Sequence, residues 1–326
     1  MHARAAAWIA IGAASMLMLC AVGAVAGEYP DRPIRLLVPG APGGGMDAVA
    51  RLVANNIADT LKQPVVVENR PGAAGNIAVN QLAKSAPDGY TIALGQTSQL
   101  AINPTLYRHL PYDPFKDFVP VLLLADAPNV FIVPSASPYK SLADIVAAAK
   151  KLPDGMDVAT PGIGTVSHLA AELFARSAGI KFHHIPSSSA TSALMDTAAA
   201  RIPLMLSSIP TSLGLIQSGQ VRAIAVSARE RNAILPEVPT VEEQGYPGFD
   251  AGTWYGLLVP AGTPADIVAR LNEAANAALK EPTIVERVRA EGGVVLGGSS
   301  AEFSDKLHVE NSKWAKVIKE AGLDLE

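Results

Sequence analysis

The chain has 326 residues, 49% of them hydrophobic, and a formal net charge of −4. Its 30 acidic residues outnumber its 26 Lys and Arg, and basic runs are lacking, which argues against nucleic acid as a partner. Cys20 is the single cysteine, so a chain cut after residue 26 has no disulfide, thiolate metal site or cysteine nucleophile. About 300 residues are enough for two domains, each with its own core.

The first 26 residues differ in composition from the rest of the chain. Residues 5–22 form an apolar run, and residues 24–26 (Ala-Val-Ala) place small side chains before Gly27, as in a cleavable export signal. A membrane anchor is the alternative, because the run is long for a signal peptide. The Ala and Gly content and the small-residue ending favour cleavage, so we predict a signal peptide cut after Ala26 and a periplasmic protein.

The first predicted unit is a strand, a glycine turn and a helix. Residues 34–38 are apolar and branched, as in a buried strand, and residues 39–45 hold two prolines and four glycines. Apolar residues then recur at helical spacing over 46–61. Such a helix directs free N–H groups and its positive dipole end at one point, which suits a small anion. The turn lacks a P-loop Lys-Ser/Thr and a GxGxxG spacing, so a nucleotide is disfavoured, and a structural loop that binds nothing is the alternative.

Two similar units follow. Residues 64–67 and 90–94 are predicted strands, separated by a second glycine turn at 69–75 and a helix over 76–84. Three such units predict a parallel sheet with crossover helices, whose ligand lies beyond the carboxyl ends of the strands. The third strand is followed by Thr97 and Ser98, whose hydroxyls are available to cap a helix or to face a ligand.

The middle of the chain carries weaker patterns. Residues 103–120 are dense in Pro and aromatic side chains and are expected to be irregular. Residues 121–124 and 130–133 are expected to form two strands, with residues 125–129 crossing between domains. A capping box predicts a helix over 141–150.

The pattern of strand, glycine turn and helix recurs over residues 157–179. A short strand at 157–160 leads to Gly162 and Gly164, and a helix follows in which Thr165 and Ser167 are available as N-cap or as ligand donors.

Three histidines lie in or near this unit. His168, in the first turn of the helix, either fixes the loop through a hydrogen bond or contacts the ligand. His183 and His184 belong to a predicted strand over 181–185, in which only one of them points inward. A metal site is disfavoured, because neither has a carboxylate at ligand spacing in the sequence.

A polar run at 187–192 is either a solvated loop or a third hydroxyl-rich wall of the ligand cleft. The run precedes a predicted helix that ends near residue 200. The later predicted elements are helices over 211–217, 264–280 (capped by Thr263), 283–291 and 301–321, and strands over 204–206, 221–227 and 254–259.

The two glycine turns that lead into helices, at 39–47 and 161–168, belong to what the pattern predicts as separate lobes. Residues 27–126 and 255–326 form lobe 1 of this prediction, and residues 127–254 form lobe 2. Helix N-termini that face each other from two lobes predict a protein that binds its ligand in the cleft between the lobes and closes on it.

Seven segments carry a more specific pattern, namely PGAPGGGMDAVAR, VVENRPGAAGNIA, APDGYTIALG, INPTLYRHLPYDPFKDFVPV, TPGIGTVSHLAAELF, LPEVPTVEEQGYPGF and WYGLLVPAGTP. In this order they resemble the Bug family of periplasmic solute receptors of tripartite tricarboxylate transporters. The resemblance implies an α/β, two-lobed type II periplasmic-binding-protein fold and a small carboxylate ligand. It also implies delivery of the ligand to two membrane subunits.

In the Bug family, one loop from each lobe grips the ligand carboxylate, partly through bridging water. The resemblance therefore implies ligand contacts at Ala41, Pro42, Gly43, Gly44 and Asp47, and at Gly162, Gly164, Thr165 and His168. Thr97 and Ser98 match a small hydroxylated loop, and Ser188 and Ser207 complete the set of candidate ligand residues.

The sequence departs from the family pattern in one region. Relatives commonly carry Tyr-Lys-Gly where this chain has three serines at 187–189, and Gly-Gln-Val-Asp where it has Ala-Arg-Ile-Pro at 200–203. Ser207 and Ser208 stand where an acidic residue is frequent. Because an acidic residue there would pair with a ligand ammonium, its absence favours a carboxylate without a cationic group, either a dicarboxylate or an aromatic acid.

Two competing functions are weighed against the receptor. A hydrolase that uses the serines and His168 would lack the GxSxG elbow and a carboxylate partner recognisable in the sequence, so no enzymatic activity is expected. A ligand sensor that feeds a signalling partner is the other alternative. We expect no cofactor and no metal, membrane subunits as partners, no nucleic acid, and a monomer.

Overall fold

The computed structural model describes residues 29–43, 45–187 and 189–325. The predicted signal peptide at residues 1–26 and the candidate site residues Gly44 and Ser188 lie outside this part of the chain. Residues Arg32–Glu326 form one compact unit, and the fold below is the fold of this unit.

The first strand–turn–helix unit forms as predicted. Strand β1 (Ile34–Val38) is almost fully buried, and α2 (Gly45–Leu61) follows the glycine turn. The apolar stripe of α2, including Val53 and Ile57, is inaccessible to solvent, because it covers the sheet. Strand β1 pairs in parallel with β2 (Val65–Asn69) on one side and with β3 (Thr91–Gln96) on the other. Short helices η2 (Ala73–Gly75) and α3 (Asn76–Ala83) connect the last two strands.

Strand β4 is a single strand from Phe118 to Pro134, where the sequence predicted two. Up to Pro128 it pairs antiparallel with β9 (Gly252–Pro260) and β10 (Val294–Gly297). From Asn129 it pairs with β7 (Leu204–Ser208) and β8 (Val221–Val226). The expected break is absent because partner strands from distant parts of the chain satisfy the backbone groups along the whole length.

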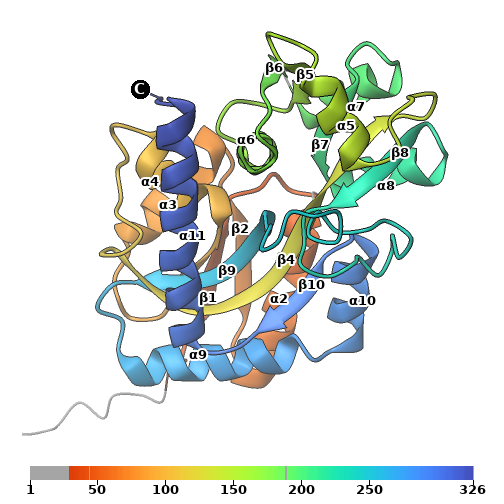
Figure 1. Cartoon of the computed structure of the whole chain (residues 1–326). Helices are drawn as coiled ribbons and strands as arrows, with labels where there is room; N and C mark the ends of the chain where they lie inside the picture. The colour runs from red at the N-terminus through yellow and green to blue at the C-terminus, as the bar shows by residue number, and fades with distance from the viewer. Residues whose placement is uncertain (1–28, 44, 188, 326) are drawn as a thin grey trace, which may run out of the picture. The chain divides into compact units, whose positions relative to one another are not determined.

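Strand β4 therefore belongs to two groups of strands, as Figure 1 shows for the long yellow strand that runs between them. The first strand group has the order β2-β1-β3-β9-β4, with β10 beside β4. The second strand group has the order β4-β7-β5-β6, with β8 beside β4, and its parallel strands are β5 (Met156–Thr160), β6 (Phe182–Pro186) and β7. The parallel sheet predicted from the first three strands is thus present in the first strand group, and the second strand group has a parallel sheet of its own.

The first two helices of the second strand group begin where the sequence predicted. The capping box of Ser141 and Asp144 opens α5 (Leu142–Ala149), and both of its hydrogen bonds are formed. Thr165 caps α6 (Val166–Ala178). Ser189 caps α7 (Ala190–Ala198), so this helix begins within the polar run that was expected to precede it. Helix α8 (Ile209–Gln217) follows β7.

Three local predictions are wrong. Thr263 does not cap α9 (Ala265–Ala278), because its hydroxyl donates to the carbonyl of Pro260 and Pro264 occupies the N-cap position. The region predicted as irregular from residue 103 begins with α4 (Asn103–Leu106), which continues from a π-helix, η3 (Ser98–Ile102). Strand β10 was missed, since four residues between glycines carry too little periodicity.

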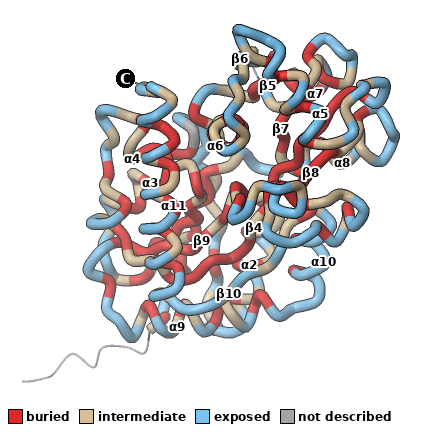
Figure 2. Tube along the Cα trace, viewed as in Figure 1, coloured by how far each residue is buried: buried red, intermediate tan, exposed pale blue. Residues whose placement is uncertain are grey.

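The last helices are α10 (Pro282–Ala290) and α11 (Ser300–Ala321), and α11 packs against β4, η3 and α6. Figure 2 shows the buried residues concentrated on the strands and on the helix faces turned toward them. Within this core, the carboxylate of Glu310 accepts hydrogen bonds from the indole N–H groups of Trp254 (3.2 Å) and Trp314 (3.0 Å). Helix α11 is thereby tied to β9 by polar groups as well as by apolar packing.

Candidate functional site

A cavity of about 670 Å³ is lined by residues from both strand groups. Six of the lining residues lie at or just after the carboxyl ends of the six parallel strands: Pro39, Gly72, Gln96, Pro161, Ala190 and Ser208. Others lie where β4 and β9 cross between the groups, including Asn129 and Thr253. The cavity therefore occupies the position where parallel α/β sheets bind ligands.

Several helices begin at this cavity. Met46 of α2, Val166 of α6, Ala190 of α7 and Pro210 of α8 all line it from the first turn of their helix. The first-turn N–H groups of a helix have no partner within the helix, and the dipole places partial positive charge there. Among the described lining residues none is Lys, Arg or His. The cavity is thus suited to an anion that is held by backbone amides and hydroxyls.

The start of α6 is held in place by side-chain hydrogen bonds. The Thr165 hydroxyl donates to the carbonyl of Gly162 at 2.9 Å and accepts the N–H of His168 at 3.3 Å. Ser167 donates to the side-chain oxygen of Asn129 at 3.0 Å, and Asn129 donates to the carbonyl of Ala251 at 2.9 Å. This chain of bonds links the α6 N-terminus to the segment where β4 and β9 cross.

Asp47 lies beneath the first glycine turn and not in the cavity lining. Its carboxylate is 4% exposed and accepts hydrogen bonds from the Gly43 N–H at 2.9 Å, from Arg51 Nε at 3.0 Å and from Asn69 Nδ2 at 3.0 Å. Hydrogen bonds from Arg51 and then from Gly43 are the main causes that lower its pKa to about 2. Asn69 also donates to the Gly40 carbonyl at 3.1 Å, so the ionised Asp47 fixes the turn from below.

The residues of the first turn lie beside the cavity. Pro39 and Met46, at the two ends of the turn, line the cavity, whereas Ala41, Pro42 and Gly43 are exposed and do not. The described part of this turn therefore borders the cavity without forming its wall.

His168 fixes the second turn, which is one of the two roles the sequence left open. Its Nδ1 accepts the N–H of Gly164 at 3.0 Å, and the residue is buried. Burial, followed by the nearby charge of His184, lowers the pKa of His168 to about 4, against an opposing effect of Glu172. The ring is therefore neutral at pH 7, and because Nδ1 accepts, its proton is on Nε2.

His183 and His184 each lie beside a carboxylate that is distant in the sequence. His183 Nδ1 lies 2.8 Å from Asp157, and His184 Nε2 lies 2.8 Å from Glu172, because parallel pairing and the following helix bring these residues together. No group of three or more His, Cys, Asp or Glu arranged to hold a metal ion occurs among the described residues.

The remaining candidates divide into those that line the cavity and those that do not. Gly164, Thr165 and Ser98 line it, whereas Gly162 does not. Thr97 is fully buried, and its hydroxyl accepts the N–H of Trp254 at 2.9 Å, so it serves the sheet. Ser207 is buried and is replaced in the lining by Ser208, as expected from the alternation of side chains along a strand.

Several polar lining residues were not predicted: Gln96, Asn103, Tyr107, Asn129, Thr211, Thr253 and Tyr255. Ser167, which the sequence offered as a ligand donor, also lines the cavity. Gly72 and Gly75 of the second glycine turn, which the sequence marked, were not included among the ligand residues but do line the cavity. The polar residues carry no common local motif, since long-range pairing of β4 and β9 places several of them.

Periplasmic solute-binding proteins share this fold, with α/β groups of strands and a ligand cavity at the strand ends. The chain belongs to the tripartite tricarboxylate transporter family of receptors, whose family model matches residues 49–323. The family resemblance and the fold class expected from the sequence are therefore confirmed.

Individual relatives agree with this assignment. Protein BugT of Bordetella pertussis is 35% identical over 302 residues, which cover 92% of this chain and 93% of BugT. A Rhodopseudomonas palustris protein solved with adipate is 34% identical and has a TM-score of 0.78. The match covers 91% of this chain and 99% of the R. palustris protein. MatC from the same organism, solved with bound malate, is 33% identical and has a TM-score of 0.74. The match covers 89% of this chain and 100% of MatC.

Proposed function

We propose that the protein is a periplasmic receptor that binds a small carboxylate in the 670 Å³ cavity and presents it to the membrane subunits of a transporter. The observation that carries the proposal is the meeting of several helix N-termini at a cavity whose described lining has no Lys, Arg or His. Such a site compensates a carboxylate with oriented N–H dipoles and needs no fixed cation.

The ligand is a dicarboxylate or an aromatic acid that lacks an ammonium group. Ser207 and Ser208 leave no acidic partner for an ammonium at the end of β7. Glu291, the acidic residue in the described lining, is paired with Arg287 at 2.6 Å. The adipate and malate held by the two R. palustris relatives, which are diacids without an amino group, support the same class.

The proposed ligand contacts come from both strand groups. Ser98, Gly164 and Thr165 contact the ligand directly from the cavity wall. The first turn, with Ala41, Pro42, Gly43 and Gly44, and the loop at Ser188 contact it when the cleft closes. Asp47 and His168 act through these loops, because each is hydrogen-bonded to a loop N–H and neither lines the cavity.

The two lobes that close on the ligand comprise residues 27–126 with 255–326, and residues 127–254. The partner change of β4 between Pro128 and Asn129, and the start of β9 at Gly252, support these boundaries. Bending at these two connections would move one lobe relative to the other.

The mature chain begins at Gly27 after export, acts as a monomer, and catalyses no reaction. No helix in the described part of the chain combines the length and the hydrophobicity that a membrane crossing needs. His168 Nδ1 accepts the N–H of Gly164, and no serine hydroxyl among the described residues hydrogen-bonds to this ring.

Mass spectrometry of the periplasmic protein tests the cleavage site, and any mature end other than Gly27 contradicts it.

The ligand class is tested with matched pairs of acids in calorimetry and thermal unfolding. Malate and aspartate share a skeleton and differ in hydroxyl against ammonium, as adipate and 2-aminoadipate differ in hydrogen against ammonium. We expect the acid without nitrogen to bind in at least one pair, and at 100 times its Kd to stabilise the fold by about 2.7 kcal/mol. Tight binding of aspartate or glutamate, with no binding of succinate, adipate, terephthalate or nicotinate, would refute the proposal.

A further inference from the structure

A second, smaller cavity of about 60 Å³ adjoins the ligand cavity. The two share five lining residues, namely Met46, Ala127, Pro210, Tyr255 and Glu291. We call the smaller cavity the side pocket. The five shared side chains place the side pocket directly beside the ligand cavity.

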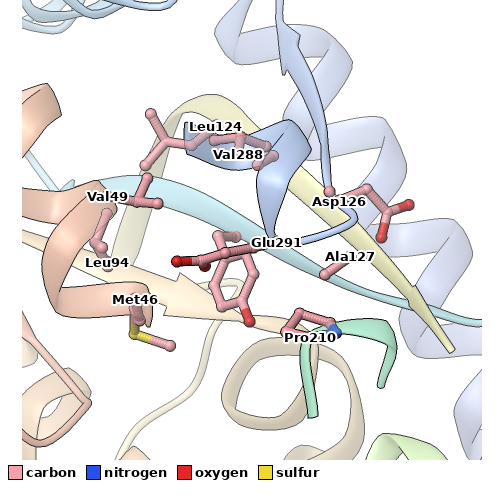
Figure 3. Close-up of a pocket in the computed structure, with 12 residues that line it drawn as sticks. Met46, Val49, Leu94, Leu124, Asp126, Ala127, Pro210, Val288 and Glu291 are labelled. Atoms are coloured by element: carbon pink, nitrogen blue, oxygen red, sulfur yellow. The ribbon is translucent and has the colours of Figure 1, made fainter. Parts of the chain in front are cut away.

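The walls of the side pocket are hydrocarbon. Figure 3 shows Val49, Leu94, Leu124 and Val288 around it, contributed by α2, β3, β4 and α10. Asp126 also lines it, but in Figure 3 its carboxyl group points away from Val49 and Leu94. The carboxyl of Asp126 instead lies against Gly252, where a Cβ would meet Oδ1. The apolar walls make the pocket a poor environment for a charged group.

Two polar side chains, Tyr255 and Glu291, lie where the side pocket and the ligand cavity meet. Burial raises the pKa of Tyr255 to about 12, so its hydroxyl remains a hydrogen-bond donor at neutral pH. Glu291 is paired with Arg287 and lines both cavities, so the apolar walls of the side pocket are what disfavour a second carboxylate there. A diacid therefore keeps both charged ends in the ligand cavity, and only an uncharged part of the molecule enters the side pocket.

We propose that the side pocket is a subsite for a short hydrocarbon group on the ligand, a branch or chain segment of two or three carbon atoms. This inference rests on the proposed carboxylate receptor and narrows its ligand class to acids that carry such a group. The size follows from the volume, since an engineered apolar cavity of about 150 Å³ holds benzene, and 60 Å³ therefore admits less than half a ring.

The test measures Kd by calorimetry for diacids with and without an alkyl branch: succinate, methylsuccinate and ethylsuccinate, and adipate with 3-methyladipate. Each carbon buried in the pocket should lower Kd by about fourfold, which is the equivalent of about 0.8 kcal/mol per methylene. Binding of the parent acids with no gain from the branch would overturn the subsite and leave the carboxylate receptor standing. If no carboxylate binds at all, the receptor and the subsite are both wrong.

Variants at Val49 assign the gain to this pocket. Val49 lines the side pocket but not the ligand cavity and is partly exposed, so a larger side chain has room to enter. Val49→Phe should fill the pocket and bring the ratio of the branched and unbranched Kd values to one or reverse it. Val49→Ala should enlarge the pocket and shift the preference toward the ethyl branch. Val66→Phe, at an exposed position on β2 outside both cavities, should keep the wild-type ratio.

An unchanged Kd ratio in both Val49 variants would show that the branch binds elsewhere and would overturn the inference. The Val49→Ala variant removes atoms without crowding its neighbours, so it provides this result even where Val49→Phe fails to fold. Thermal unfolding of each variant without ligand verifies the fold before the Kd values are compared.

Discussion

Replacement of Asp47 by Ala should lower both the stability of the fold and the affinity for the ligand. The carboxylate accepts hydrogen bonds from the Gly43 N–H, Arg51 and Asn69 at 2.9–3.0 Å. A hydrogen bond to a charged group contributes about 1.5–3 kcal/mol, but Arg51 is half exposed, so its share is at the low end. Together the three bonds predict a loss of about 2–4 kcal/mol in the free energy of unfolding.

The loss of affinity follows from the position of the turn. Without Asp47, the Gly43 N–H has no side-chain acceptor from α2, and the turn between Pro39 and Met46 is free to take other conformations. We expect the ligand Kd to rise by about tenfold or more, equivalent to about 1–3 kcal/mol. Thermal unfolding should show a Tm lower by roughly 3–7 °C, and calorimetry with the best-binding acid measures the affinity.

The charge of Asp47 is tested separately with Asp47→Asn. The folded pKa of about 2 lies below the unfolded value of about 3.9, so the unfolded state binds more protons between these values. The contribution of Asp47 is therefore fully present above about pH 4 and is lost as the pH falls toward 2. The difference in stability between wild type and Asp47→Asn should shrink over this range.

The control is Asp59→Ala, at an exposed position near the end of the same helix, which should leave Tm and Kd close to wild type. A normal Kd in Asp47→Ala with a lowered Tm would mean that the turn is only structural and makes no contribution to binding. A normal Tm would contradict the energetic reasoning itself.

Three further predictions concern other parts of the structure. Glu310→Ala leaves two buried indole N–H groups without an acceptor and should cost about 2–4 kcal/mol in urea unfolding; Glu310→Gln, which keeps one acceptor oxygen, should cost less. Gly164→Ala places a Cβ against Leu106 at a φ of +78°, so it should destabilise the fold by about 1–3 kcal/mol and weaken ligand binding, and Leu106→Ala should restore only the steric part. His168 has a folded pKa of about 4, below its unfolded value of about 6.5, so wild-type stability should rise between these pH values as the unfolded state loses its extra proton. His168→Gln should flatten that rise in denaturant titrations, and an equal slope in both proteins would count against the neutral buried ring.

Much of the fold was predictable because its signals are local. The strands next to the glycine turns, the stripe of α2 and the capping box at Ser141 depend on residues within a few positions of one another. The continuity of β4 was not predictable in this way. Its second half pairs with β7 and β8, which lie about 70–100 residues further along the chain, so no window around Pro128 contains the information.

The same division applies to the candidate site. Gly164, Thr165 and Ser98 were predicted and line the cavity, because a turn that opens a helix is visible in the sequence and so is the hydroxyl beside it. Thr97 was predicted as well, but its neighbour across the sheet, Trp254, takes its hydroxyl. The family pattern marked Asp47 as a ligand contact, but Asp47 does not line the cavity, and its hydrogen bonds to Gly43 and Arg51 emerged only from the packed structure.

By itself, the amino-acid sequence determined where backbone N–H groups are left free, because proline, glycine and capping residues act on their immediate neighbours. Only the tertiary structure decided which of these groups line one shared cavity and which lie outside its lining and hold the loops in place. Long-range strand pairing through β4 and β9 makes that decision, since it sets the position and direction of side chains that are distant in the chain. The apolar side pocket is of the same kind, because four separate elements contribute its walls.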